Sequence, residues 1–229
     1  MNQDSKTIFK DSRETIVIYY TYFHLGYFYS QLSKKEDISQ KFIWKPWIIC
    51  SPNERYLLRE DIIKDSLADI YKKCQLPDIF FNLISNNSVR GITMAVREAL
   101  KDKGIRNLFL EYIFNNDEAL CNNFEGVVRF IRNTFSHNMR DRIELKITDY
   151  KDQIKYLEKE KKSTAINFFF DYAKSPIPIN RANYTVKIDI DFNQIKDGVV
   201  YTDVISEYQT LLFIELCYNC MEHIQGKLA

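Results

Sequence analysis

Apolar residues recur at helical spacing through most of this 229-residue chain. This spacing is typical of helices that turn one face toward a core. The helices that we predict from it cover residues 12–33, 53–71, 78–85, 88–103, 105–114, 117–137, 149–162 and 202–225. We expect Ser12 to cap the first helix, Pro77 to close the region that Asn53 opens, and Gly104 to break the chain between two helices.

A second periodicity follows residue 142, where apolar and polar residues alternate one by one. The alternation is almost perfect over 184–192, less regular over 166–172 and short over 143–147. Period-two alternation predicts strands that are half buried against a core. The remaining irregular segments that we predict are an extended or irregular stretch over 42–50, a loop over 175–180 and a turn over 194–198.

These elements predict a mainly α fold in a single domain, residues 1–229. It is a helical bundle with a small antiparallel β insertion, about residues 142–198, before the last helix. With only 6 glycines and 5 prolines, long regular elements and short turns are expected. The edges of the insertion lack flexible linkers, so we do not predict an independent domain there.

Composition limits the classes of function. The formal charge is +1, so a nucleic-acid site would have to be a local basic patch. The 16 Phe and 15 Tyr are expected mainly in the core, although some could stack on bases. Five cysteines fit no disulfide framework, and no run reaches the roughly 20 apolar residues of a bilayer span. We therefore expect a cytoplasmic protein without membrane contact.

The most informative residues lie near the end of the helix predicted over 117–137. Arg132 is followed directly by Asn133, and His137 comes five positions after the arginine. A histidine can give or take a proton near neutral pH, and a guanidinium can bind phosphate oxygens and offset developing negative charge. Together they suit RNA cleavage without a metal.

The spacing of this pair raises a geometric question. On an ideal helix Arg132 and His137 lie roughly 140° apart, whereas Asn133 and His137 share one face. The pair could converge if the long arginine swings toward the helix end. Two copies facing each other in a symmetric homodimer would bring the residues together better.

The stretch from Arg132 to Asn138, Arg-Asn-Thr-Phe-Ser-His-Asn, resembles the signature of the HEPN superfamily (higher eukaryotes and prokaryotes nucleotide-binding domains). The order of predicted helices, with the motif late in the bundle and one helix after it, is similar as well. The strands before the last helix depart from the minimal HEPN bundle. They look like an elaboration found in bacterial members tied to toxin–antitoxin and phage-defence systems.

The resemblance implies a dimeric, metal-independent endoribonuclease that needs no cofactor. It implies catalytic roles for Arg132 and His137, with Asn133 orienting the histidine or a phosphate. Asn138, Arg140 and Arg142 would extend the RNA-binding strip, and a cognate antitoxin is a possible partner. The alternative is a catalytically silent HEPN-like module that serves binding or assembly.

Two other candidate sites are weaker. Cys217, Cys220 and His223 have a zinc-like spacing, but all three lie on one predicted helix and the cysteines continue its apolar stripe. We expect buried cysteines and no metal site. His24, in the aromatic first helix, is expected to be a core or interface histidine.

Overall fold

The computed structural model describes residues 2–35, 47–50, 55–58, 76–137, 143–161, 163–177 and 185–228. The predicted class is confirmed: these ranges are mainly helical, with seven α-helices and an antiparallel hairpin before the final helix. Contacts divide the chain into two compact units, residues 1–22 with 86–229 and residues 23–85. The predicted insertion, 142–198, belongs to the larger unit. No helix within the described ranges combines the length and apolarity needed to cross a membrane.

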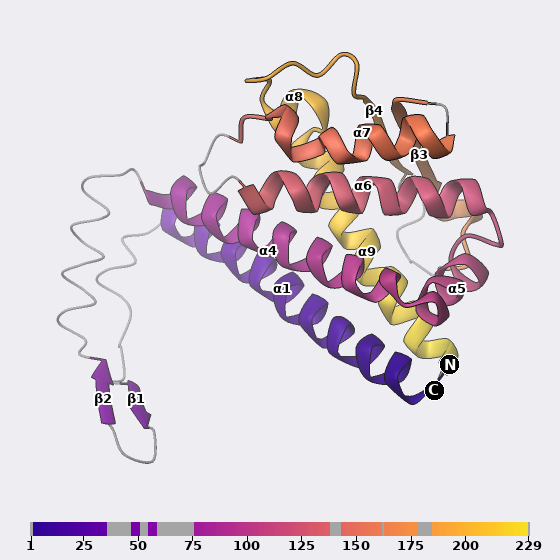
Figure 1. Ribbon diagram of the computed structural model, residues 1–229. Helices are drawn as coiled ribbons and strands as arrows, with labels where there is room; N and C mark the ends of the chain where they lie inside the picture. Colours follow the sequence, from indigo (N-terminus) through magenta and orange to yellow (C-terminus); the bar gives the residue numbers. More distant parts are fainter. Residues whose placement is uncertain are drawn as a thin grey trace. The chain divides into compact units, whose positions relative to one another are not determined.

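The larger unit holds most of the helices. Its complete helices are α5 (Lys103–Tyr112), α6 (Glu118–His137), α7 (Ile147–Lys161), α8 (Tyr201–Val204) and α9 (Glu207–Leu228). The boundary between the units falls within α1 (Gln3–Lys35) and α4 (Leu76–Lys101). In Figure 1, α6 runs between α7 and α4, so the helix that carries the motif is flanked on both sides.

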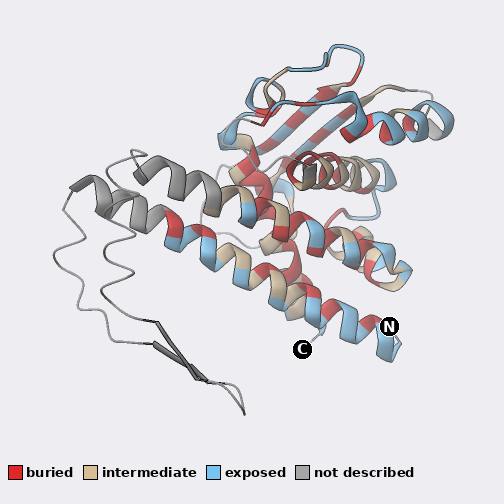
Figure 2. Ribbon diagram, turned by 60° about the vertical axis from the view of Figure 1, so that its left-hand side comes forward, coloured by how far each residue is buried: buried red, intermediate tan, exposed pale blue. Residues whose placement is uncertain are grey.

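The hairpin of the larger unit packs against α6 and α9. Strand β3 (Ala165–Asp171) pairs antiparallel with β4 (Thr185–Asp191), with Phe168 opposite Ile188. Every second residue of each strand is buried, as Figure 2 shows by its alternating colours. Two of the three predicted strands are therefore confirmed, because alternation reports which residues turn toward a core.

The centre of the core is aromatic. Phe124 of α6 is fully buried, and its ring lies 5.3 to 5.8 Å from those of Phe109, Phe114, Phe168 and Phe213. These rings come from the short helix α5, its following turn, β3 and α9. The expectation that the aromatic excess serves mainly as core is confirmed for this cluster, which fixes α6 against the hairpin and the last helix.

The first helix begins earlier than predicted. Helix α1 starts at Gln3, and Ser12, the predicted cap, lies buried in its second quarter. The side chain of Asn2 accepts a hydrogen bond from the backbone nitrogen of Ser5 at 2.7 Å, so Asn2 does the capping. The segment before Ser12 is mostly polar, but its Phe9 is buried.

The break between α4 and α5 was predicted at Gly104 and lies at Asp102 instead. The Asp102 carboxylate accepts a hydrogen bond from the backbone nitrogen of Ile105 at 3.0 Å, which caps α5. Helix α4 is also one piece where two, 78–85 and 88–103, were predicted. Pro77 stands in its first turn, where the missing N–H of a proline is tolerated. The region that Pro77 was predicted to close lies mostly outside the described residues.

Two further predictions in the larger unit were wrong. Residues 143–147 form no named strand, although Ile143 and Leu145 are buried. Backbone hydrogen bonds join this segment to residues 198–201, and Ile147 already belongs to α7. The predicted last helix is divided into α8 and α9, because the Ser206 hydroxyl accepts a hydrogen bond from the backbone nitrogen of Gln209 and starts a new helix.

The smaller unit contains a hairpin that was not predicted. Strand β1 (Trp47–Cys50) pairs antiparallel with β2 (Arg55–Leu58), with Trp47 opposite Leu58. The extended prediction for 42–50 is confirmed over 47–50, but the predicted helix over 53–71 is wrong where β2 lies. Residues 59–75 lie outside the described ranges.

Candidate functional site

The predicted site residues lie in the last turns of α6. Val127, Val128 and Ile131 of this helix are buried, which leaves Arg132 and Asn133 half-buried on its other side. Helix α6 continues to His137, its last residue, whose side chain is outside the described part of the molecule. Asn138, Arg140 and Arg142 also lie outside the described residues.

Asn133 connects two arginines from different helices. Its side-chain oxygen accepts a hydrogen bond from Nη1 of Arg132 at 3.0 Å and from Nη1 of Arg97 on α4 at 3.4 Å. The sequence suggested that Asn133 orients the histidine or a phosphate. In the structure its oxygen holds two guanidinium groups beside each other at the end of α6. The role of Asn133 toward the histidine or a phosphate stays a prediction.

A third arginine adds to the positive charge. Arg129 lies one turn before Arg132 on α6, and it lines a hollow between α4 and α6 together with Arg97. Within the described part of the chain, none of the three arginines forms a salt bridge with a carboxylate. Burial, and then the charges of Arg132 and Arg129, lower the pKa of the Arg97 guanidinium from its usual value. We call Arg97, Arg129 and Arg132 the arginine cluster.

Arg106 on α5 shows the opposite arrangement. Its guanidinium donates to Glu118 and Asn122, at 2.9 and 3.0 Å, and also to Glu125. The hydrogen bond to Glu118 has the largest effect on the pKa of Arg106 and raises it above its usual value. Arg106 therefore stabilises the fold by pairing, whereas the arginine cluster concentrates positive charge that no carboxylate among the described residues pairs and that an anion would neutralise.

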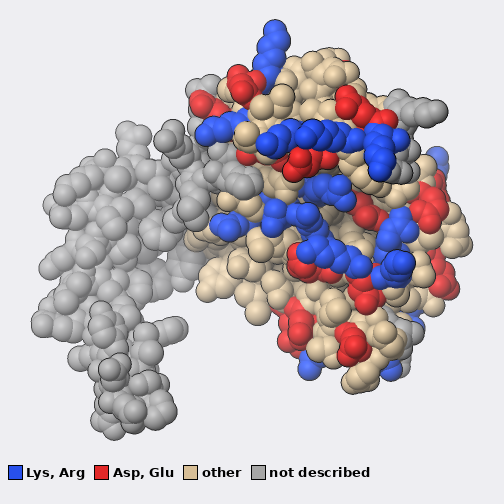
Figure 3. All heavy atoms as spheres, in the orientation of Figure 1, with Lys and Arg blue, Asp and Glu red and all other residues tan. Residues whose placement is uncertain are grey.

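The surface around α6 is positively charged although the whole chain is nearly neutral. Figure 3 shows Lys and Arg side chains gathered over α6 and α7, with acidic side chains interspersed among them. Because the formal charge of the chain is only +1, any nucleic-acid site was expected to be a local patch of this kind. The arginine cluster lies on α4 and α6, the helices that border this surface.

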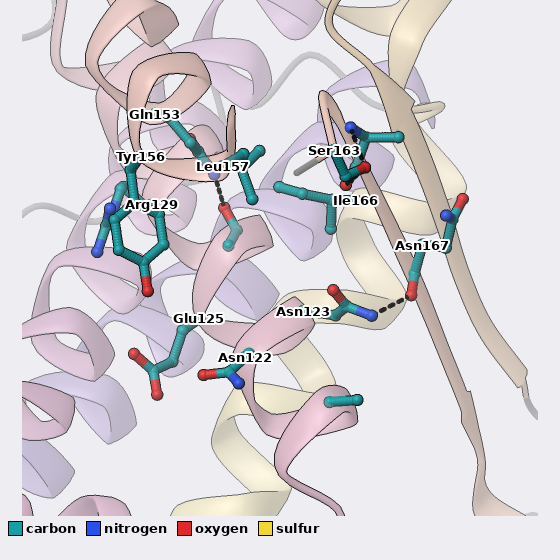
Figure 4. Close-up of a pocket in the computed structure, with 13 residues that line it drawn as sticks. Asn122, Asn123, Glu125, Arg129, Gln153, Tyr156, Leu157, Ser163, Ile166 and Asn167 are labelled. Atoms are coloured by element: carbon teal, nitrogen blue, oxygen red, sulfur yellow. Dashed lines mark hydrogen bonds between the residues drawn. The ribbon is translucent and has the colours of Figure 1, made fainter. Parts of the chain in front are cut away.

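Next to the cluster, α6, α7 and the start of β3 enclose a pocket of about 240 Å³. Figure 4 shows polar side chains from all three elements around it. Arg129 lines this pocket as well as the hollow beside Arg97, and its guanidinium lies 5.1 Å from the ring centre of Tyr156 on α7. The pocket and the arginine cluster are therefore neighbouring parts of one surface.

The zinc-like spacing on α9 has a structural explanation. Cys217 and Cys220 are fully buried, and burial raises the pKa of both thiols, which disfavours the thiolate that zinc binds. Among the described residues, no group of three or more His, Cys, Asp or Glu side chains is placed to hold a metal ion. His24 is exposed, and its ring lies edge-on to that of Phe23, so it is not a core histidine. The interface position stays a prediction.

Arg129 and Arg97 were not predicted as site residues. Arg129, Arg132 and Asn133 are spaced so that they share one helical face, and this signal could have been found. Arg97 could not, because it lies 36 positions before Asn133 and reaches it only through the packing of α4 against α6. The pocket likewise depends on three elements that are distant in sequence.

No protein-family model, curated protein or solved structure gives a significant match to the chain.

Proposed function

We propose that this protein is a metal-independent endoribonuclease of the HEPN type. The observation that carries the proposal is the arginine cluster, which gathers three guanidinium groups without carboxylate partners in the described part of the chain, on and beside the helix that ends at His137. Such a cluster suits a phosphate group, and a histidine next to it suits proton transfer. The resemblance of residues 132–138 to the HEPN signature points the same way.

The proposed reaction uses the RNA itself as nucleophile. The 2′-hydroxyl oxygen attacks the adjacent phosphorus and the bond to the 5′-oxygen of the next nucleotide breaks, which leaves a 2′,3′-cyclic phosphate and a 5′-hydroxyl. His137 transfers a proton in this step, either from the attacking hydroxyl or to the leaving oxygen. Arg132 neutralises the charge on the phosphate oxygens, and Asn133 positions Arg132 through their 3.0 Å hydrogen bond.

The assembly that we propose is a homodimer with the end of α6 at or near its twofold axis. The helix stays regular to His137, so the rotation between Arg132 and His137 is not removed by an early end of the helix. A second copy would supply the missing half of each site. Asn138, Arg140 and Arg142 would extend the RNA-binding strip. A toxin or phage-defence role, with a cognate antitoxin, follows from the HEPN resemblance alone.

The alternative is a silent HEPN-like module that binds RNA or a partner without cutting. The arginine cluster would serve a binding protein too, because anion binding does not need His137. Cleavage of RNA separates the two functions, since only an enzyme requires both the arginine and the histidine.

The decisive test is cleavage of a mixed RNA in the presence of EDTA. We expect His137→Ala and Arg132→Ala each to lower the rate by about 100- to 10,000-fold, the usual loss for acid–base or electrostatic catalysis. Lys10→Ala on the exposed surface of α1 removes one positive charge elsewhere and should cut like the parent. Unchanged cleavage by both site variants, or a parent protein that never cuts, would favour the silent module.

A further inference from the structure

Gln153, one of the residues that line the pocket beside the arginine cluster, carries a buried acceptor without a partner among the described residues. Gln153 of α7 is 2 % exposed, and its Nε2 donates to the backbone oxygen of Gly126 at 2.7 Å. The backbone oxygen of Gly126 can only accept a hydrogen bond, so the Gln153 side-chain atom that faces it is the nitrogen Nε2. The other terminal atom of this side chain is therefore the oxygen Oε1. Gln153 Oε1 is buried and has no hydrogen-bond partner among the described residues. A buried acceptor left in this way costs free energy until a donor reaches it.

Two asparagines give the pocket further polar groups. Asn123 Nδ2 donates to the backbone oxygen of Asn167 at 2.6 Å, as the dashed line in Figure 4 marks, and its own oxygen keeps capacity to accept. Asn122 uses its oxygen for Arg106, and its Nδ2 keeps capacity to donate. Glu125 also lines the pocket, but Arg106 neutralises its carboxylate. The pocket therefore offers both donors and acceptors with little net charge.

One side of the pocket is a flat aromatic group. Tyr156 is 43 % exposed, and the Arg129 guanidinium covers its ring at 5.1 Å. Apolar side chains, Leu157 and Ile166, line the pocket as well. A planar ligand with polar edges fits this combination, because stacking uses its faces while the amides bind its edge.

The position of Arg129 connects the pocket to the phosphate site. This residue lines the pocket on one side and the hollow that contains Arg97 on the other. A ligand that fills the pocket therefore places whatever is bonded to it next to the arginine cluster. A nucleobase has both properties that this requires: its edges carry N–H donors for Gln153, and its ribose is joined to phosphates.

We propose that this pocket binds one unstacked base of a single-stranded RNA, whose neighbouring phosphates lie on the arginine cluster. Gln153 Oε1 accepts a hydrogen bond from the edge of the base, Asn122 and Asn123 supply a donor and an acceptor, and Tyr156 stacks on its face. The assignment rests on the proposed function for its substrate class. The base pocket on α6 and α7 would add base specificity to the arginine cluster, which by itself recognises only the phosphates of the RNA backbone.

The test measures binding without cleavage. Fluorescence anisotropy is recorded with short single-stranded 2′-O-methyl RNA, which lacks the free 2′-hydroxyl and cannot be cut. Homopolymers of each base are compared with an abasic oligomer of equal length and charge. We expect the parent protein to bind at least one base-bearing oligomer more tightly than the abasic one. Tyr156→Ala should lower that preference by about 5- to 150-fold, the range for losing one stacked base.

Two further variants make the result specific to the pocket. Ala119→Leu adds side-chain volume at the pocket from an exposed position on α6, and it should weaken the preference as well. Tyr208→Ala removes a tyrosine of α9 that is 57 % exposed and outside the pocket, and it should bind like the parent. Equal binding of abasic and base-bearing RNA by the parent, or a preference that survives both pocket variants, would overturn the proposal.

The outcome is separable from that of the cleavage test. If the protein cuts RNA but shows no preference that depends on the pocket, this inference fails and the proposed function stands. If the preference depends on Tyr156 but no RNA is ever cut, the base site stands and the protein is a binding module.

Discussion

Replacing Arg97 with methionine should leave the protein as stable as the parent or slightly more stable, although a hydrogen bond is lost. Nη1 of Arg132 and Nη1 of Arg97 lie 3.0 and 3.4 Å from the same Asn133 oxygen, so these two nitrogens are at most about 6.4 Å apart. Like charges at this distance repel by about 0.7 kcal/mol in water and by about 3 kcal/mol at an effective dielectric constant of about 20. Both side chains are half-buried, so we expect about 1 kcal/mol.

The lost hydrogen bond reduces this gain. A bond of 3.4 Å to a neutral amide contributes about 0.5 to 1 kcal/mol at most. The net change in the free energy of unfolding is therefore about 0 to 0.5 kcal/mol in favour of Arg97→Met. The aliphatic part of the arginine is retained in methionine, so packing against α6 changes little.

Arg106→Met is the matched control, because it removes the same group from a position where carboxylates surround it. Loss of the bonds to Glu118 and Glu125 should cost about 1 to 3 kcal/mol. Urea denaturation followed by circular dichroism measures both variants at about 0.1 M and about 1 M NaCl, between which the Debye length falls from about 10 Å to about 3 Å. High salt should reduce the advantage of Arg97→Met.

The same variant should weaken RNA binding. Removing one phosphate contact from a single strand lowers the slope of log affinity against log salt by about 0.7. Arg97→Met would then be at least as stable as the parent and yet a poorer binder. Should it lose as much stability as Arg106→Met, Arg97 is a structural residue, and the arginine cluster is not held for an anion.

Three further outcomes are expected. Gly91→Ala should lower the free energy of unfolding by about 1 to 3 kcal/mol, because the new Cβ would lie 2.3 Å from the Tyr19 ring. In Gly226→Ala the new Cβ meets nothing within 4 Å, so this variant should raise the free energy of unfolding by about 0.5 kcal/mol. Equal melting temperatures of the two variants would contradict this. Burial lowers the pKa of His223, so the unfolded chain binds a proton at this imidazole more readily than the folded protein does. The free energy of unfolding should therefore fall as pH drops through about 6.5. If His223→Gln leaves the pH dependence of urea denaturation unchanged, His223 is not the cause. If His137 transfers a proton, the cleavage rate should change near the same pH value of about 6.5, moved by its surroundings, and a rate that is flat from about pH 5 to 9 would leave it only a positioning role.

Those parts of the fold that depend on local pattern were predicted well. Helix α6 begins one residue after Asp117, whose side chain accepts from the backbone nitrogen of Leu120, and its apolar stripe is buried as expected. The strands β3 and β4 were found because alternation survives in both of them. The apolar stripe of α6 and the alternation in β3 and β4 each come from residues within the element that they predict.

The wrong predictions share another cause. Alternation over 143–147 reported burial correctly, but a strand also needs a partner, and only an isolated bridge from Glu144 to Val200 forms. The early start of α1 depends on a cap at Asn2 in a segment that looked polar. At the site, Arg132 and Asn133 were predicted, whereas Arg97 joins them only through tertiary packing of α4, which periodicity does not report.

The end groups of RNA treated with the parent protein in EDTA test the central claim most directly. The proposed reaction predicts fragments that carry a 2′,3′-cyclic phosphate at one end and a 5′-hydroxyl at the other. It also predicts that a 2′-O-methyl RNA of the same sequence stays intact. Fragments with a 3′-hydroxyl and a 5′-phosphate, or cleavage that stops when EDTA is added, would contradict a metal-independent attack by the 2′-hydroxyl.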